Sequence, residues 1–420
     1  MGPVPEEQKI RIALVGGGIA GLSLAIGLAN ASHLEITVYE ATKEYREVGQ
    51  GLAMHSNAIA SMQSIDPAVF EAWRDSSTLV GSPEDADAIS STTVSLAWGP
   101  DMGTNVAELG QAKARKGVSR ADLLSGLLKV LKERGGNIQM GKRLKSIQDH
   151  GESVHMTFED GSEATADCLL GAEGAHSKTR EYLLGADHPA LAVKNPERYV
   201  SLRSMIPMDA ARPVIDDHWT RNVSIRIGPY GYIVSMPVKK GTVLQIGTTF
   251  LAPQDEDIRH TQLRAEEFGD YSAEFQRLIE LSKTVHPDRL YFWDHDPAPT
   301  YYRNRVCMLG DAAHCTMPFA GNGAAQALED AAVFKALLDR VRTSGQLPAL
   351  LGAFDEVRRP RSQKVASISR QFGRLHMMLD PPDHNLDEIK RIYADGAAYC
   401  SNIDIEAQNQ EAVRAFEDGR

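Results

Sequence analysis

Cysteine is scarce in this sequence. Four cysteines among 420 residues are too few and too scattered for a disulfide framework. None belongs to a C-x-x-C pair and none has a histidine at metal-ligand spacing, so we expect reduced, buried thiols and no metal site. The four are Cys168, Cys307, Cys315 and Cys400.

Long hydrophobic runs and excess positive charge are also missing. The longest apolar stretch, residues 12–29, is interrupted by Gly16, Gly17, Gly18 and Gly21 and is not typical of a membrane span. Residues 1–11 lack the apolar segment of a secretory leader. The formal net charge of −11 argues against binding to nucleic acid or to an anionic membrane. These absences predict a cytoplasmic protein with small-molecule ligands, and the chain is long enough for two domains.

A glycine-rich turn follows the first apolar strand, residues 10–15. Gly16, Gly18 and Gly21 fit the pattern G-x-G-x-x-G, and a helix is expected from about residue 20 to 30. In such a turn the first glycine permits a tight bend, the second lets the backbone approach a pyrophosphate, and the third allows close packing of helix on strand. The backbone N–H groups of Ile19 and Ala20 would then face the phosphates. A glycine turn without a ligand is the other interpretation.

An acidic residue ends the next expected strand, residues 34–40. Glu40 lies 40 − 21 = 19 residues beyond Gly21, the usual distance for a carboxylate that binds a ribose hydroxyl. The fingerprint by itself fits NAD as well as FAD.

The rest of the chain reads as a mixture of helices and strands. Ser119 and Asp122 form a capping box for a helix over 119–134. Residues 199–250 alternate with period two, which indicates an antiparallel meander with one buried face. Buried strands are expected at 168–170 and 306–309, a helix at 324–340, and amphipathic helices from about 347, with a break at Pro381 and Pro382.

These elements predict an α/β fold, in which an antiparallel-sheet substrate domain and C-terminal helices are added to a Rossmann-like dinucleotide-binding domain. We expect the first domain to comprise residues 1–75, 108–190 and 298–365. The substrate domain would comprise 76–107 and 191–297, and a helical segment would span 366–420.

Three sequence blocks together resemble the group A flavoprotein aromatic monooxygenases, which share the p-hydroxybenzoate hydroxylase fold. The first block is the glycine turn with Glu40. The second is Gly171-Ala172-Glu173-Gly174 with Arg180, and the third is Gly310-Asp311-Ala312-Ala313-His314 followed by Pro318, Gly321-Asn322-Gly323 and Glu329-Asp330. Smaller matches are Gly51 with Asn57, and Arg120. The chain looks most like the salicylate hydroxylase and fungal phenol hydroxylase branch.

The resemblance implies tightly but non-covalently bound FAD, with NAD(P)H as a transient reductant and O₂ as co-substrate. It implies hydroxylation of a phenolic or hydroxybenzoate-type ring through a flavin C4a-hydroperoxide, with or without loss of CO₂, in a monomer or homodimer. Asp311 would bind the ribitol side of FAD and Arg120 its phosphate or ribitol region. Gly321, Asn322, Gly323 and Ala324 would approach the flavin ring, and Gly51 would lie beside it. His314 is expected to serve packing and hydrogen bonding.

Two positions depart from the family pattern. Glu173 stands where the family usually has aspartate, and this puts the contacts of the pyrophosphate edge and of the reducing nucleotide in doubt. Asn322 replaces a common glutamine, with little consequence expected because the backbone does the work of that loop.

Five residues are candidates for the substrate side. His55 has the residue type of a general base near neutral pH, and Arg203 that of a cation pairing with a phenolate or carboxylate. Tyr232 and Met236 share one strand face, and Pro318 lies in the loop before the helix at 324–340. The structural alternatives are an ordinary buried histidine, a solvent-facing arginine and core packing.

Other functions fit parts of the same pattern. An FAD enzyme of this fold can instead perform epoxidation, Baeyer–Villiger insertion or dehydrogenation. A flavin-binding interaction protein without turnover and an NAD-dependent dehydrogenase are further alternatives, and the block at Gly310-Asp311 argues against the last.

Overall fold

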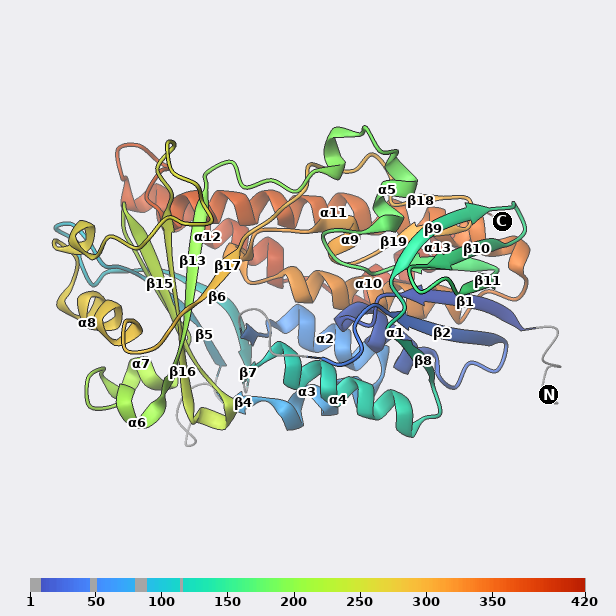
Figure 1. Ribbon diagram of the computed structural model, residues 1–420, viewed down its shortest axis with the longest axis horizontal. Helices are drawn as coiled ribbons and strands as arrows, with labels where there is room; N and C mark the ends of the chain where they lie inside the picture. The colour runs from blue at the N-terminus through green and yellow to red at the C-terminus, as the bar shows by residue number, and fades with distance from the viewer. Residues whose placement is uncertain (1–8, 46–50, 80–88, 114–115, 420) are drawn as a thin grey trace.

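The long helix α11 (Leu347–His376) runs past two different sheets in the computed structural model, which describes residues 9–45, 51–79, 89–113 and 116–419 (Figure 1). One sheet is mainly parallel and lies towards one end of the elongated molecule. The other is mainly antiparallel and lies towards the opposite end. The α/β prediction is confirmed.

The parallel sheet forms around the N-terminal strand. Within the described residues it has six strands in the order β18-β19-β12-β1-β2-β8, with β18 antiparallel to the rest. The carboxyl ends of β1, β12 and β19 are adjacent, so the three glycine blocks that follow these strands meet at one edge. The strands are β1 (Ile10–Val15), β2 (Leu34–Glu40), β8 (Asn137–Met140), β12 (Cys168–Gly171), β18 (Tyr302–Arg303) and β19 (Val306–Met308).

Helices and a small sheet complete this part of the molecule. Stacking of Tyr39 on Phe158, at 4.9 Å between ring centres, joins the parallel sheet to a three-stranded sheet made by β9 (Leu144–Asp149), β10 (Val154–Phe158) and β11 (Glu163–Ala166). Ser119 caps α4 through the N–H of Asp122, as predicted. The helices are α1 (Ile19–Leu28), α2 (Ser56–Ile65), α3 (Pro67–Ser76), α4 (Arg120–Glu133), α5 (Lys178–Leu184), α9 (Asp311–His314) and α10 (Gly323–Leu338).

The large sheet has the order β17-β13-β16-β15-β14-β5-β6 in the part of the chain that is described. The prediction of a simple antiparallel meander is wrong in two respects. β13 pairs with β16, because α6 (Met208–Ala211) and α7 (Asp217–Arg221) intervene before β14, and β14 pairs with β5 in parallel. The strands are β5 (Ile89–Leu96), β6 (Asn105–Lys113), β13 (Tyr199–Pro207), β14 (Ser224–Ile227), β15 (Gly231–Val238), β16 (Val243–Leu251) and β17 (Asp288–Tyr291).

Both faces of this sheet are buried, whereas the sequence predicted one. Ser224, Ile225, Arg226 and Ile227 are all buried along β14. The face of Arg226 is covered by α7 and by α8 (Ala273–Ser282): its guanidinium lies 3.7 Å from the Trp219 ring centre and pairs with Glu274. A period of two in the sequence shows only that successive side chains point to opposite faces of the sheet. Polar residues on the second face can still be buried when they have hydrogen-bond or charge partners.

The C-terminal helices cover the other face. After α11 the chain breaks at residues 377–385, as Pro381 and Pro382 suggested, and continues as α12 (Leu386–Ser401) and α13 (Ile405–Asp418). The expected domain boundaries at 107/108 and 365/366 fall inside β6 and α11. A strand or helix can continue from one domain into the next, and the sequence carries no local signal at that point.

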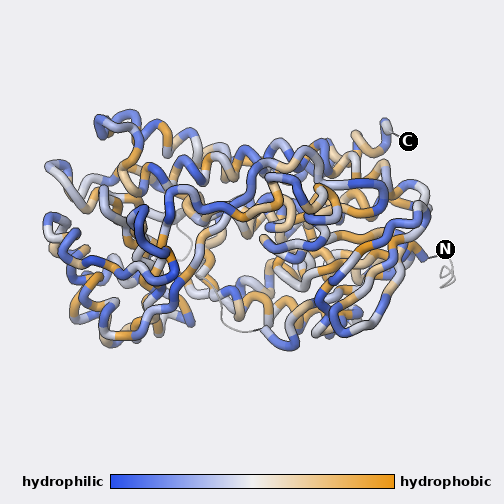
Figure 2. The backbone as a smooth tube through the Cα atoms, turned by 45° about the horizontal axis from the view of Figure 1, so that its top comes forward, coloured by the Kyte–Doolittle hydropathy of each residue, from blue (hydrophilic) through white to orange (hydrophobic). Residues whose placement is uncertain are grey.

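Apolar segments fill the sheets and inner helices, whereas hydrophilic segments occupy the outer turns (Figure 2). All four cysteines are free and buried. Among the described residues, no helix has the length and apolar character needed to cross a bilayer, and no group of side chains is arranged to hold a metal ion.

Candidate functional site

The glycine turn after β1 leaves open space at one position only. At Gly16, φ is +112°, and a Cβ on Gly21 would lie 2.1 Å from the Gly16 carbonyl oxygen, so both positions require glycine. A Cβ on Gly18 would meet nothing within 4 Å. α1 begins at Ile19 without a side-chain cap, so its first N–H groups, including that of Ala20, point into this space. The turn is therefore shaped to receive an anion.

Glu40 is held rigidly at the side of the turn. One carboxylate oxygen accepts from the Gly17 N–H at 2.7 Å, and the other accepts from the N–H and hydroxyl of Thr42. Tyr45, which the sequence analysis missed, donates its hydroxyl to the Gly17 carbonyl at 2.6 Å. A carboxylate has about four acceptor positions, so Glu40 retains capacity for a ribose hydroxyl.

The second block is turned inward. Glu173 is partly buried and accepts hydrogen bonds from the Ser177 hydroxyl and from the N–H and hydroxyl of Thr179, at 2.8–2.9 Å. Burial raises the pKa of this carboxyl despite those bonds. The longer side chain therefore fastens the start of α5 to the glycine block.

Arg180 ties the second block to the third. Its guanidinium is fully buried and donates to the carbonyls of Ala312 and Ala313, within α9, as well as to those of Ala190 and Asp296. Burial lowers its pKa to about 10. Asp311, the first residue of α9, makes no side-chain hydrogen bond to the residues described, so its carboxylate is available to a ligand.

The loop over residues 317–323 is held from behind by α11. The Ser369 hydroxyl accepts from the Ala320 N–H at 3.1 Å and donates to the Met317 carbonyl at 2.6 Å. Gly321 has φ +61° and is required there, and α10 starts at Gly323 and Ala324 without a side-chain cap. Pro318 is exposed at the front of the loop.

Asn322 is the buried anchor of this loop. Its amide oxygen accepts from Asn57 at 3.2 Å and from Gln326 at 2.9 Å. Its nitrogen donates to Nδ1 of His55 at 3.1 Å. His55 precedes α2 and packs between Gly321 and Gly110: a Cβ on Gly110 would lie 2.2 Å from the ring. Because Nδ1 accepts, the neutral ring carries its proton on Nε2.

Behind Asn322 lies a fully buried cluster of charges. Arg358 of α11 pairs with Glu329 at 2.6 Å and with Asp330 at 2.7 Å, and Arg361 also pairs with Glu329. Burial alone would raise the pKa values of both acids, but the positive charges hold them below their ordinary values. Asp330 also binds Nε2 of His314 and the Gly310 N–H, which confirms the hydrogen-bonding role expected of His314. We expected Glu329 and Asp330 from the family block but did not anticipate Arg358, because charges on an amphipathic helix usually face solvent.

The predicted substrate-side residues are distributed over one face of the large sheet. Met236 packs against Gly51, since a Cβ on that glycine would lie 3.1 Å from the Met236 sulfur. Tyr232 lies four residues earlier on the same strand and therefore points to the same face. Arg203 is on the same face of β13, next to the edge strand β17, and its Nε lies 3.2 Å from the carboxylate of Asp288. Arg120 is exposed at the start of α4, and its side chain has no partner among the residues described.

An aromatic cluster surrounds Phe319. The ring centres of Tyr199, Tyr232, Phe292 and His376 lie 4.7–6.1 Å from that of Phe319. His376 ends α11 and also lies 5.9 Å from Tyr393 of α12. Four polar atoms in this cluster are buried without a partner in the described structure: both ring nitrogens of His376 and the hydroxyls of Tyr199 and Tyr393.

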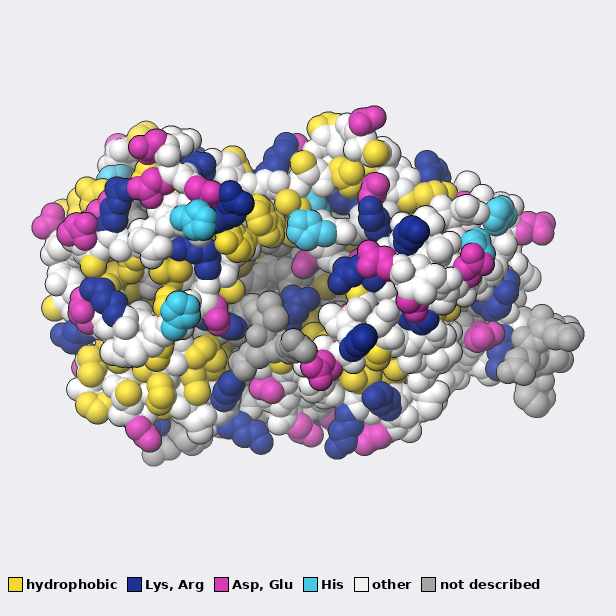
Figure 3. All heavy atoms as spheres, viewed as in Figure 1, with side chains coloured by type: hydrophobic (Ala, Val, Ile, Leu, Met, Phe, Trp, Pro, Cys, Tyr) yellow, Lys and Arg dark blue, Asp and Glu magenta, His cyan; other side chains and the backbone are white. Residues whose placement is uncertain are grey.

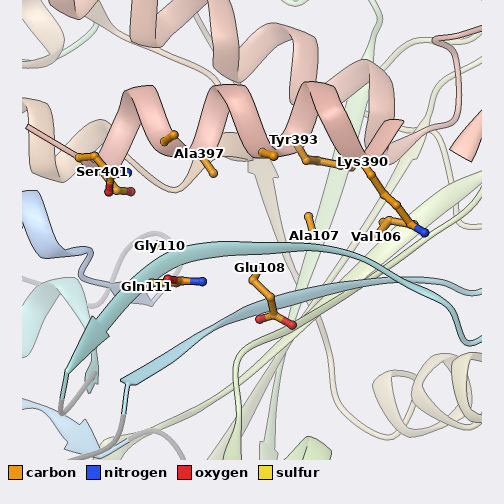
Figure 4. Close-up of a pocket in the computed structure, with 12 residues that line it drawn as sticks. Val106, Ala107, Glu108, Gly110, Gln111, Lys390, Tyr393, Ala397 and Ser401 are labelled. Carbon is orange, nitrogen blue, oxygen red and sulfur yellow. The ribbon is translucent and has the colours of Figure 1, made fainter. Parts of the chain in front are cut away.

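Two hollows adjoin these residues. The space-filling view shows a depression between the halves of the molecule (Figure 3). A cleft of about 320 Å³ lies between β6 and α12 (Figure 4). The cleft is lined by residues that include Ala107, Gly110, Tyr393 and Ala397. Behind this lining, His55 lies against Gly110 and His376 lies against Tyr393.

Comparisons with known proteins agree with this geometry. The model of the FAD binding domain family matches residues 9–369. A 6-methylsalicylate 1-monooxygenase of Aspergillus terreus is 34% identical, with 98% of this chain and 93% of that protein covered. A salicylate hydroxylase of Pseudomonas putida is 31% identical, with 97% and 95% covered. A solved salicylate hydroxylase substrate complex has a TM-score of 0.82 at 26% identity, covering 97% of this chain and 98% of that one.

Proposed function

The chain belongs to the FAD binding domain family and is an FAD-dependent aromatic monooxygenase, and we propose that it hydroxylates a phenolic or hydroxybenzoate-type ring with NAD(P)H and O₂. The loop of residues 317–323 carries the proposal. The end of this loop at Gly323 starts α10, and Phe319 packs against Tyr199 and Tyr232 of the large sheet. A ring bound at that face would therefore lie next to a flavin bound at the loop.

The residues present fit FAD. The open space at Gly18, the uncapped starts of α1 and α10 and the available carboxylate of Asp311 are unused by the protein's own described contacts. We propose that Gly18, Ile19 and Ala20 bind the pyrophosphate, Glu40 a ribose hydroxyl and Asp311 the ribitol. Arg120 would supply a charged donor, and Gly51 with Gly321–Ala324 would border the flavin ring. Gly16 and Gly21 shape the turn.

FAD, when bound, accepts a hydride from NAD(P)H and delivers one oxygen atom of O₂ to the ring. The chain's contribution is to hold the ring, exclude water and place hydrogen-bonding groups. Tyr232 and Met236 would form the ring's wall on the sheet side, and the Pro318 backbone would border it on the loop side. His55 would keep Asn322 in place through the hydrogen bond at its Nδ1.

Arg203 is a weaker candidate for the substrate's anion. Its pair with Asp288 neutralises the charge that an anionic ring would need. NAD(P)H is proposed to bind transiently, since the sequence has no second G-x-G-x-x-G turn to hold another dinucleotide.

Consumption of NADH and NADPH by the FAD-loaded protein, measured against a panel of phenols and hydroxybenzoates with product masses, tests the proposal. We expect stimulation by a ring substrate and a product heavier by one oxygen atom, or a hydroxylated ring that has lost CO₂. Flavin reduction that yields only peroxide with every ring would contradict the aromatic substrate and favour epoxidation or Baeyer–Villiger chemistry.

A further inference from the structure

The aromatic cluster around Phe319 contains a histidine that the protein leaves without a partner. His376 is 1% exposed, and neither ring nitrogen has a hydrogen-bond partner in the described structure. Burying a polar group without a hydrogen-bond partner costs free energy. Each nitrogen of the ring can therefore still form a hydrogen bond with a ligand.

Two neighbouring hydroxyls are in the same situation. Tyr393, 5.9 Å away on α12, and Tyr199, beside Phe319 on β13, are buried with unpaired oxygens. Tyr232 also faces His376, at 4.9 Å between ring centres. Aromatic rings form the rest of the cluster, and such rings favour contact with another aromatic ring that carries a polar substituent.

The position of His376 relates it to the reaction site. Gly373, one turn earlier on α11, lies directly against Phe319, since a Cβ there would be 2.4 Å from that ring. Ser369, two turns earlier, holds the loop at Ala320 and Met317. The same face of α11 therefore supports the loop and places His376 beside its aromatic residue.

The surroundings of His376 are uncharged. Among the residues that the structure describes, the titratable groups that face it are Tyr232 of β15 and Tyr393 of α12, and burial raises the pKa of both. Burial alone lowers the pKa of His376 to about 3, with no acidic partner to oppose it. The neutral imidazole can accept a hydrogen bond on one nitrogen and donate on the other, whereas an isolated carboxylate here would be costly.

We propose that His376 is the substrate-binding residue that accepts a hydrogen bond from the phenolic hydroxyl, with the ring entering from the cleft between β6 and α12. This inference rests on the proposed function. Tyr393 lines the cleft and also contacts His376, so it connects the opening with the buried cluster (Figure 4).

Binding of phenol, anisole and benzoate to the FAD-loaded protein, followed by the change in flavin absorbance, tests the inference. Anisole keeps the ring and oxygen but cannot donate. We expect the wild type to bind phenol about five- to tenfold more tightly than anisole, the equivalent of one neutral hydrogen bond. H376L should bring that ratio close to one, and H376Q, which keeps an acceptor, should restore part of it.

The matched control is H295L. His295 is also buried and lies beside Arg180, and its substitution should leave the phenol-to-anisole ratio unchanged. FAD content and thermal unfolding identify any variant that fails to fold, in which case H376Q and Y393F supply the comparison. A phenol-to-anisole ratio in H376L equal to that of the wild type overturns the inference.

Dependence on pH supplies a second readout. With a neutral His376, phenol affinity should be constant between pH 5 and 8. Benzoate binding that strengthens as pH falls and is lost in H376L would show an imidazolium–carboxylate pair and overturn the inference. A wild-type protein that binds no phenol would overturn the proposed function together with it.

Discussion

Arg358 of α11 and Asp330 of α10 form an ion pair of 2.7 Å in which both side chains are fully buried. Asp330 uses its other oxygen to hold the Gly310 N–H at the start of α9, and Arg358 also binds Glu329. Through this pair, α11 fixes the two loops proposed to surround the flavin.

Arg358→Leu should destabilise the protein severely. The change leaves two buried carboxylates short of their cation, for which about 3–5 kcal/mol is expected. Chemical denaturation and FAD retention measure the effect. Arg359→Ala is the control, because that neighbouring arginine is 30% exposed and its pair with Asp355 should contribute less than about 1 kcal/mol. Equal losses of unfolding free energy in the two variants would show that the buried pair stabilises the protein no more than the exposed one.

The same cluster predicts an acid-sensitive stability. The pKa values of Glu329 and Asp330 are lowered in the folded protein, so their contribution is fully present above the unfolded carboxyl pKa of about 4. It should be lost progressively as pH falls below that value. Unfolding free energies measured from pH 7 to pH 3 should fall less steeply in Arg358→Leu than in the wild type, and parallel curves would contradict the assignment.

Two glycines of the turn should respond differently to alanine. Gly21→Ala would place a Cβ 2.1 Å from the Gly16 carbonyl oxygen, so the FAD-free protein should unfold at a lower temperature. Gly18→Ala meets open space and should change that temperature little, yet its methyl group would occupy ligand space and weaken FAD binding about tenfold or more. Thermal unfolding without FAD and a flavin fluorescence titration separate the two effects. Unchanged FAD affinity in Gly18→Ala would count against the turn as the pyrophosphate site.

Blocking the cleft should affect the substrate and spare the cofactor. Ala397→Phe places a large ring among residues that line the cleft, so KM for the aromatic substrate should rise severalfold with unchanged FAD affinity. Asp395→Phe, an exposed position on the same helix that does not line the cleft, is the control. Identical KM values in both variants would indicate that the substrate enters elsewhere, for example from the hollow in Figure 3.

The sequence predicted the local parts of this site well. The strand before Gly16, the capped helix after Ser119 and the strand ending at Glu40 depend on short-range patterns, and all three are present. The pairing of β13 with β16 and the parallel pairing of β14 with β5 were not predicted, because register between distant strands leaves no local signal.

The residues missed are those whose role depends on packing. Arg358 looks like a solvent-facing helix residue until α10 and α13 cover it. His376 is an isolated histidine in sequence, and its neighbours Tyr232, Phe319 and Tyr393 come from three separate segments. A helical-wheel view of α11 would have shown the one available clue, a stripe of polar residues at helical spacing.

That stripe has a geometric consequence. Arg358 and His376 are 376 − 358 = 18 residues apart on one continuous helix, which is five full turns, and Ser369 falls within about 20° of the same line. Arg358, Ser369 and His376 thus point to the same side of α11, with about 27 Å along the helix axis between the first and the last. One residue inserted between Ser369 and His376 would rotate the imidazole by about 100°, whereas a seven-residue insertion would nearly restore its direction but displace it by about 10 Å. The length of α11 is therefore constrained in whole turns by the distance between two sites that never touch each other.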